Sequence, residues 1–230
     1  MKQRKILGNK SNQEFDFDIL PMMPNQSNRL QCKEITLQAY DYKLFGEITE
    51  VEDYFDIIDA LNHASSDDEF IIRIHSGGGL LGTADVIVNA ISNTQARVHG
   101  HIESLCGSAA TMIFLSCHSY SVSPRAEFFV HTASSGTIGK EHENYASIMF
   151  SRKRIHRLIK DTYSGLLSEK EIENVLNGQD YYFDAEELSE RLESFTEYQR
   201  NKYEEEMEKI SSAIPDEEKE EPLIKKILVS

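Results

Sequence analysis

Long hydrophobic runs are missing from this chain of 230 residues. A membrane-spanning helix needs about 20 consecutive apolar residues, and every apolar stretch here is far shorter. The basic start MKQRK is followed by only a few apolar residues, so we expect no signal peptide. The sequence therefore predicts a protein of the cytoplasm that has no membrane partner.

Cysteine and positive charge are also scarce. The three cysteines, Cys32, Cys106 and Cys117, are odd in number and lack metal-site spacing, so we expect reduced thiols and no metal. The chain has 24 Lys and Arg against 39 Asp and Glu, a formal net charge of −15, which argues against binding to nucleic acid.

No G-K-[S/T] follows the glycines at 77–79, so these do not form a phosphate loop. We expect no cofactor.

The acidic residues present are concentrated near the end of the chain, in 204–206 and 216–221. Such runs are typical of a solvated tail, although a docking segment remains an alternative. We divide the chain into a flexible arm at 1–34, one domain at 35–195 and an acidic tail at 196–230.

The middle of the chain alternates between strand-like and helix-like patterns. We expect strands at 35–39, 42–46, 70–74, 98–102, 120–122 and 128–130, and helices at 51–64, 84–91, 112–117, 143–163 and 168–176. Strand, helix and strand in succession imply crossover units and a largely buried sheet, which is an α/β fold. Functional sites in such sheets form where strands give way to loops and helix starts.

Three polar residues in this region have complementary chemistry: Ser108, His131 and Asp180. A hydroxyl needs a base to become a nucleophile, and the base needs an acid that holds its tautomer. Ser108 follows a predicted strand and begins a helix, so the N–H of Ala109 is a natural donor to an oxyanion. The glycine turn at 77–79 allows close backbone approach and is expected to supply a second donor.

Each of these residues also has an ordinary structural interpretation. A serine among small residues is often a helix-packing position, three glycines are usually a turn, and Asp180 is placed to cap a turn. A histidine at the end of an apolar strand is often a hydrogen-bonded core residue. Seven other histidines compete for the role of base: His63, His75, His99, His101, His118, His142 and His156. On the residues alone these alternatives stay open.

Four motifs give the chain a resemblance to a known family. They read IHSGGG at 74–79, SLCGSAAT at 104–111, VSPRAEFFVH at 122–131 and DYYFDAEE at 180–187. The segment from 44 to 192 thereby resembles the proteolytic subunit of the ATP-dependent Clp protease, especially its shorter bacteriophage-encoded relatives. The corresponding family patterns are I-N-S-P-G-G, G-L-A-A-S-A-A-S, M-S-P-x-A-x-x-M-I-H and R-F-L-S-A-x-E-A, in the same order.

The resemblance implies a role for each motif residue. Ser108 would be the nucleophile, His131 its general base and Asp180 the acid that orients His131. The N–H groups of Gly79 and Ala109 would form the oxyanion hole. An alignment on AATM at 109–112 alone would move the nucleophile to Thr111, but Ser108 keeps the interval to His131 without a gap.

The resemblance also implies how substrate is held. Gly78, Leu80 and Leu81 would form an edge that binds an extended polypeptide by strand addition. Gly77 stands where the family has proline, and residues 132–136 lack the Gln-Pro of many cellular members.

The implied protein is a serine endopeptidase with a crotonase-like α/β fold of stacked βαβ units and a long oligomerisation helix. It would form homo-oligomeric rings, stacked into a chamber that admits unfolded polypeptides, in the host cytoplasm if a phage encodes it. ATP would be used by a partner, an AAA+ unfoldase. The alternatives are a catalytically idle ring or scaffold subunit, a viral prohead maturation protease, and an acyl-CoA enzyme on the same fold.

Overall fold

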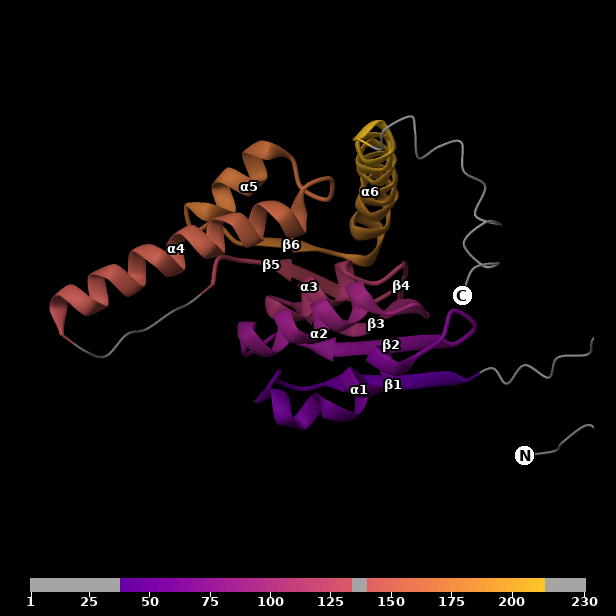
Figure 1. Cartoon of the computed structure of the whole chain (residues 1–230). Coiled ribbons are helices and arrows are strands. Elements are labelled where there is room, and N and C mark those ends of the chain that lie inside the picture. Colours follow the sequence, from indigo (N-terminus) through magenta and orange to yellow (C-terminus); the bar gives the residue numbers. More distant parts are fainter. Residues whose placement is uncertain (1–37, 134–139, 214–230) are drawn as a thin grey trace, which may run out of the picture. The chain divides into compact units, whose positions relative to one another are not determined.

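The computed structural model describes residues 38–133 and 140–213, which form a six-stranded sheet flanked by helices (Figure 1). The strands are β1 (Ala39–Phe45), β2 (Glu69–Ser76), β3 (Arg97–Gly107), β4 (Ser119–Val122), β5 (Glu127–Val130) and β6 (Tyr181–Phe183). The helices are η2 (Val51–Tyr54), α1 (Phe55–His63), α2 (Leu81–Asn93), α3 (Ala109–Leu115), α4 (Glu141–Tyr163), α5 (Glu169–Leu176) and α6 (Ala185–Ala213).

The sheet has the order β1-β2-β3-β5-β6, with β4 also paired to β3. The long strand β3 pairs with β4 over its first part and with β5 over its last part, both in parallel. Only β6 runs antiparallel, alongside β5. Helices connect β1 to β2, β2 to β3 and β3 to β4, as in successive βαβ units. The predicted α/β class is confirmed.

The core lies between the sheet and α1, α2 and α3, which cover one of its faces (Figure 1). In β2, Phe70, Ile72 and Ile74 are buried and the residues between them are more exposed, which is the period-two pattern of a strand. Ile87 and Ile91 of α2 are buried on the same side. The alternation in β2 therefore directs its apolar side chains toward the helices.

Two strand predictions needed correction. The strands expected at 35–39 and 42–46 are one strand, β1, within the described residues, because Tyr40, Tyr42 and Leu44 alternate toward the core without a turn residue between them. The strand expected at 98–102 continues to Gly107, because its second half pairs with β5. Strand β6 was not anticipated.

Helix α6 continues through position 196, where the acidic tail was expected to begin. Leu188, Leu192 and Phe195 are buried and fasten its first half to the core. Its second half is solvated and helical as far as Ala213, with a Lys209–Glu205 pair at 3.9 Å. The arm at 1–34 and positions 214–230 lie outside the described residues.

Helix α4 differs between its two ends. Ile159 and Tyr163 near its C-terminal end are buried, whereas Ile148, Met149 and Phe150 are 47–72% exposed. The first half of α4 therefore presents apolar side chains that the described part of the chain does not cover. Across the described ranges, no helix combines the length and hydrophobicity needed to cross a membrane.

Candidate active site

Ser108 stands between β3 and α3 in an unusual backbone conformation. Its φ is 52° and its ψ is −126°, and it is the one non-glycine residue in the described ranges with a positive φ. Such a conformation costs on the order of 1–3 kcal/mol and persists only where the surroundings hold it. Here the Ser108 N–H donates to the Phe129 carbonyl at 3.1 Å, and its carbonyl accepts from the Thr111 N–H at 3.0 Å.

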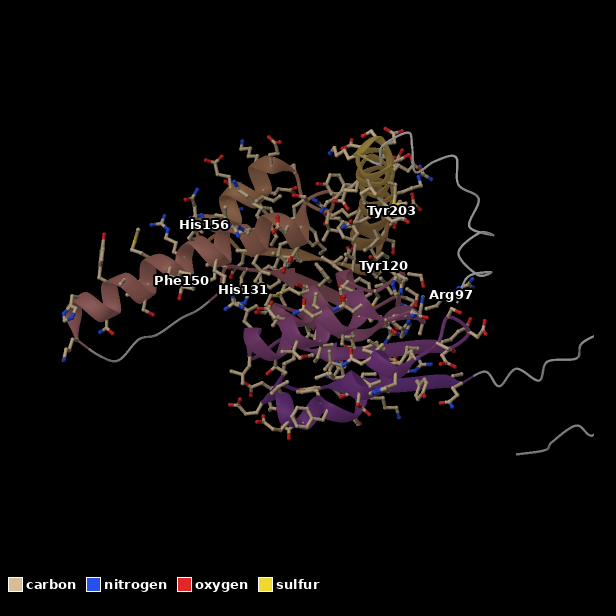
Figure 2. The ribbon with its side chains drawn as sticks, viewed as in Figure 1. Arg97, Tyr120, His131, Phe150, His156 and Tyr203 are labelled. Carbon is tan, nitrogen blue, oxygen red and sulfur yellow. The ribbon has the colours of Figure 1, made fainter. Side chains whose placement is uncertain are left out.

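His131 directly follows β5 and meets Ser108 across the sheet. The parallel pairing of Gly107 with Phe129 brings the ends of β3 and β5 together. The Nε2 atom of His131 lies 2.7 Å from the Ser108 Oγ atom, a distance at which the hydroxyl can donate to the imidazole. Figure 2 shows His131 at the end of β5, on the side where α4 passes. The structure thus unites the predicted nucleophile and base.

Two backbone amides beside Ser108 have the properties of oxyanion donors. Ala109 is the first residue of α3, and Gly79 lies in the turn between β2 and α2. Within the described ranges, neither N–H donates a hydrogen bond. Both amides lie along a cavity that also contains the Ser108 side chain.

The glycine turn requires residues without a Cβ. Gly78 has φ of 101°, and a Cβ there would lie 2.7 Å from the Ser108 Cβ and 2.9 Å from the Ala109 nitrogen. A Cβ on Gly79 would lie 2.2 Å from the Ile48 carbonyl oxygen. The turn therefore packs directly against the nucleophile on one side and against the loop after β1 on the other.

The cavity over Ser108 has a volume of about 540 Å³. Its lining residues are Gly77, Gly79, Leu80, Leu81, Ser108, Ala109, Phe129, His131, Ala133, Phe150, Ser151, Arg154 and Ile155. Phe150 and Arg154 come from α4, and Arg154 forms an ion pair with Asp85 of α2. The sequence analysis missed these two residues, because an exposed position on a long helix carries no signal of what lies opposite.

Leu80 and Leu81, the residues predicted to bind substrate, line this cavity, but the main chain of Leu80 is already hydrogen-bonded. The Leu80 N–H donates to the Ile48 carbonyl at 2.8 Å, and the Leu80 carbonyl accepts from the Ala84 N–H at 3.1 Å. The Leu80 side chain is 44% exposed. In this conformation Leu80 lines the cavity, and its N–H is not free for strand addition.

Asp180 follows the end of the β5–β6 ladder but is not hydrogen-bonded to His131. The antiparallel pairing of β5 with β6 ends at Val130 and Tyr181, so His131 and Asp180 are the residues next to the last pair. The Asp180 side chain is exposed, and no hydrogen bond or ion pair joins these two described residues. The structure thus brings two of the three predicted residues into contact and leaves the third beside them.

Thr111, the competing nucleophile, is fully buried. Its Oγ atom donates to the Ser108 carbonyl at 2.6 Å and lies 2.5 Å from the Tyr163 hydroxyl. Its hydroxyl makes structural hydrogen bonds, and Thr111 is not among the residues that line the cavity. The geometry favours Ser108 over Thr111.

None of the other seven histidines, all of them within the described ranges, lines the cavity over Ser108. His99 and His101 bond to the serines of β4 and the loop after it, and desolvation lowers the pKa of His99. His118 accepts from the Val98 N–H at 2.9 Å, His63 pairs with Asp59, and His75 packs edge-on against Phe45. His142 and His156 lie on α4.

No group of three His, Cys, Asp or Glu side chains in the described ranges is arranged to hold a metal ion. Cys106 and Cys117 are free and buried, and burial raises the pKa of the Cys117 thiol to about 12. A buried neutral thiol is a poor nucleophile. A second cavity of about 450 Å³, lined by Asp85, Asn89, Met112, Phe195 and others, contains no histidine or cysteine beside a hydroxyl.

Comparisons with known proteins identify the family and the fold. The family model for Clp protease matches residues 44–191, which is more than half of the chain. Among solved structures, a mutant of ClpP1 from Listeria monocytogenes is similar with a TM-score of 0.52 and 23% sequence identity. The match covers 66% of this chain and 86% of that one, and it shows the ClpP/crotonase-like fold. No curated protein matches. The chain, with its peptidase-type fold over residues 44–191, belongs to the Clp protease family.

Proposed function

We propose that this protein is a serine endopeptidase that cleaves unfolded polypeptides. The observation that carries the proposal is the 2.7 Å contact between the Ser108 Oγ and the His131 Nε2 at the base of a cavity of about 540 Å³. The unpaired N–H groups of Gly79 and Ala109 line the same cavity. A nucleophile, a base and two oxyanion donors are the groups that acyl transfer requires.

The reaction follows from these positions. The Ser108 Oγ attacks the carbonyl carbon of the scissile peptide while its proton passes to the His131 Nε2. The oxyanion accepts hydrogen bonds from Gly79 and Ala109, and loss of one such donor typically costs about 2.7–4 kcal/mol of transition-state stabilisation. His131 then protonates the leaving amine. A water molecule, deprotonated by His131, hydrolyses the acyl-enzyme and regenerates Ser108.

Asp180 is proposed as the acid that orients His131 after its side chain has rotated toward the imidazole. Its position next to Tyr181, whose partner Val130 precedes His131, supports this role. Its lack of a hydrogen bond to His131 is the one observation that favours the alternative, a catalytically idle ring subunit. The two functions differ in whether Ser108 reacts.

The proposal includes assembly into a homo-oligomeric ring, with an AAA+ unfoldase as partner and the cytoplasm as location. The exposed apolar residues Tyr145, Ile148, Met149 and Phe150 of α4 support a subunit contact. The free thiols of Cys106 and Cys117 are consistent with a reducing compartment. A closed chamber would restrict cleavage to unfolded chains that can enter it.

Labelling with a serine-directed fluorophosphonate tests the nucleophile. We expect the parent protein to be labelled at Ser108, with the adduct located by peptide mass spectrometry. Ser108→Ala should abolish labelling and peptidase activity, whereas Thr111→Ala should still carry the label at Ser108. A label that survives Ser108→Ala would place the nucleophile elsewhere, and an unlabelled parent would support the idle subunit.

Sedimentation analysis tests the assembly separately. We expect a particle much larger than one chain, and Ile148→Ser with Met149→Ser should reduce its size without unfolding the subunit. A parent that stays monomeric with full peptidase activity would contradict the ring.

A further inference from the structure

A chain of buried hydroxyl groups connects the end of α4 to the backbone of Ser108. The Tyr163 hydroxyl lies 2.5 Å from the Thr111 Oγ, and the Thr111 Oγ donates to the Ser108 carbonyl at 2.6 Å. Because the Thr111 proton is directed to that carbonyl, Tyr163 must be the donor to Thr111. Thr111 is fully buried and Tyr163 is 4% exposed, so water does not compete for these bonds.

The carbonyl at the end of this chain belongs to a functionally important peptide unit. The Ser108 C=O and the Ala109 N–H are parts of one planar trans peptide and point in opposite directions. Fixing the direction of the carbonyl therefore fixes the direction of the N–H, the one that the proposed mechanism assigns to the oxyanion. The Thr111 N–H donates to the same carbonyl at 3.0 Å, so two donors from one residue hold this plane.

This peptide plane needs support because Ser108 is strained. Its φ of 52° is disfavoured for a residue with a side chain, and rotation toward ordinary helical angles would turn the Ala109 N–H away from the cavity. Hydrogen bonds accepted by a carbonyl also polarise the peptide and strengthen the N–H as a donor.

From this geometry we propose that Thr111 and Tyr163 are positioning residues that orient and polarise the Ala109 N–H of the oxyanion hole. Neither side-chain hydroxyl contacts the reacting atoms; both act through the Ser108–Ala109 peptide. Burial raises the pKa of the Tyr163 hydroxyl, which keeps it protonated and able to donate. The inference rests on the proposed function, because it assigns the oxyanion hole a supporting structure.

Kinetics of three variants test the proposal. Tyr163→Phe should lower kcat about tenfold with little change in KM, because one hydrogen bond that supports the oxyanion donor is lost. A tenfold change corresponds to about 1.4 kcal/mol of activation free energy. Thr111→Val, which removes the hydroxyl but keeps the shape, should lower kcat further. Thr111→Ser should restore most of the activity. Affinity for a peptide boronate, which mimics the tetrahedral intermediate, should fall in parallel with kcat/KM.

Tyr120→Phe is the matched control. The Tyr120 hydroxyl also donates to a backbone carbonyl, that of Leu115, at 3.0 Å, but Leu115 is at the far end of α3. Tyr120→Phe and Tyr163→Phe should lower the thermal midpoint by similar amounts, while only Tyr163→Phe should lower kcat. Adding Tyr163→Phe to Thr111→Val should cause no further loss in kcat, because the chain passes through Thr111.

The outcomes separate this inference from the proposed function. If the parent is labelled at Ser108 and Tyr163→Phe has the kcat of Tyr120→Phe, the positioning role is wrong and the protease assignment stands. A kcat of Thr111→Val equal to that of Thr111→Ser would likewise overturn the positioning role. If the parent is not labelled at all, the proposed function itself fails.

Discussion

Ser108 and Asp180 belong to the same proposed triad but sit in very different surroundings. Ser108 lies between a long central strand and a buried helix, and its N–H, carbonyl and side chain all make hydrogen bonds. Asp180 lies before a strand of three residues at the edge of the sheet, exposed and unbonded to His131. The nucleophile and base are held by the core of the subunit, and the acid is not.

The difference indicates which part of the site is ready before substrate arrives. A strained residue such as Ser108 persists only because several bonds hold it. An exposed carboxylate at a strand end has a small barrier to reorientation. We therefore expect nucleophile activation by His131 to exist in the free subunit, and the contribution of Asp180 to appear only after a local adjustment.

The largest expected effects come from substituting the base and the acid separately. His131→Gln should reduce kcat by about 10⁴-fold or more, as in other triads. Asp180→Asn should reduce it by roughly 100-fold only, because the Ser108–His131 contact forms without Asp180. Peptidase assays on purified variants measure both.

Equal losses in the two variants would show that Asp180 is as firmly engaged as His131, and the contrast between the two regions would disappear. Full activity in Asp180→Asn would remove Asp180 from the site altogether.

A smaller effect is expected from the ion pair that holds the segment before Asp180. Arg191 of α6 bonds Glu171 of α5 at 2.9 Å and lies 4.4 Å from the centre of the Phe183 ring. The hydrogen bond from Arg191 lowers the pKa of Glu171 to about 2, against an ordinary value of 4.5. Glu171 also belongs to the capping box with Ser168 at the start of α5.

Glu171→Gln should lower the free energy of unfolding by about 1–2 kcal/mol at neutral pH, discounted because the pair is partly solvated. A lowered pKa stabilises the fold above the unfolded value, so this difference should disappear as the pH falls from about 4.5 toward 2. Urea unfolding at several pH values measures it. Glu187→Gln is the control, because Glu187 binds the same Arg191 but is 49% exposed, and its effect should be smaller. A pH-independent difference would show that the Glu171 charge is not the cause.

The smallest effect concerns the pairing of β5 with β6, which ends next to His131 and Asp180. Tyr182 of β6 stacks on Phe129 of β5, with ring centroids 5.7 Å apart. Tyr182→Thr keeps a residue that favours strands and removes the aromatic pair, so it should cost about 0.5–1 kcal/mol of stability. A reduction in kcat that depends on Asp180 should accompany it, which a double variant with Asp180→Asn would show. An additive loss in that double variant would mean that β6 does not position Asp180.

Much of the fold could be predicted from residue patterns, and the exceptions have physical reasons. Short apolar runs identified β2 and β5, and helical spacing over 51–64 identified η2 and α1, because burial leaves a signal in the local sequence. Strand β6 has three residues, too few to show a period. Helix α6 was underestimated, since its solvated half is acidic and resembles a tail.

The candidate site, like the fold, was predicted only in part from the sequence. Ser108 and His131 were identified from short motifs, and their spatial contact follows from neighbouring strands of one sheet. Thr111 entered the sequence analysis as a competing nucleophile, and its contact with Tyr163 could not be anticipated, because the two are 52 residues apart. The wall formed by Phe150 and Arg154 depends on where α4 passes.

By itself, the sequence determined the α/β class and the residue types of the site, because hydrophobic periodicity and short motifs are local properties of a chain. Only the tertiary structure decided which hydroxyl lines the cavity and which hydroxyl is buried in the core. It also decided that His131 bonds Ser108 and that Asp180 is not hydrogen-bonded to His131. Those outcomes depend on side-chain directions at the junctions of β3, β5 and β6. The packing of distant segments sets these directions, and no local pattern records them.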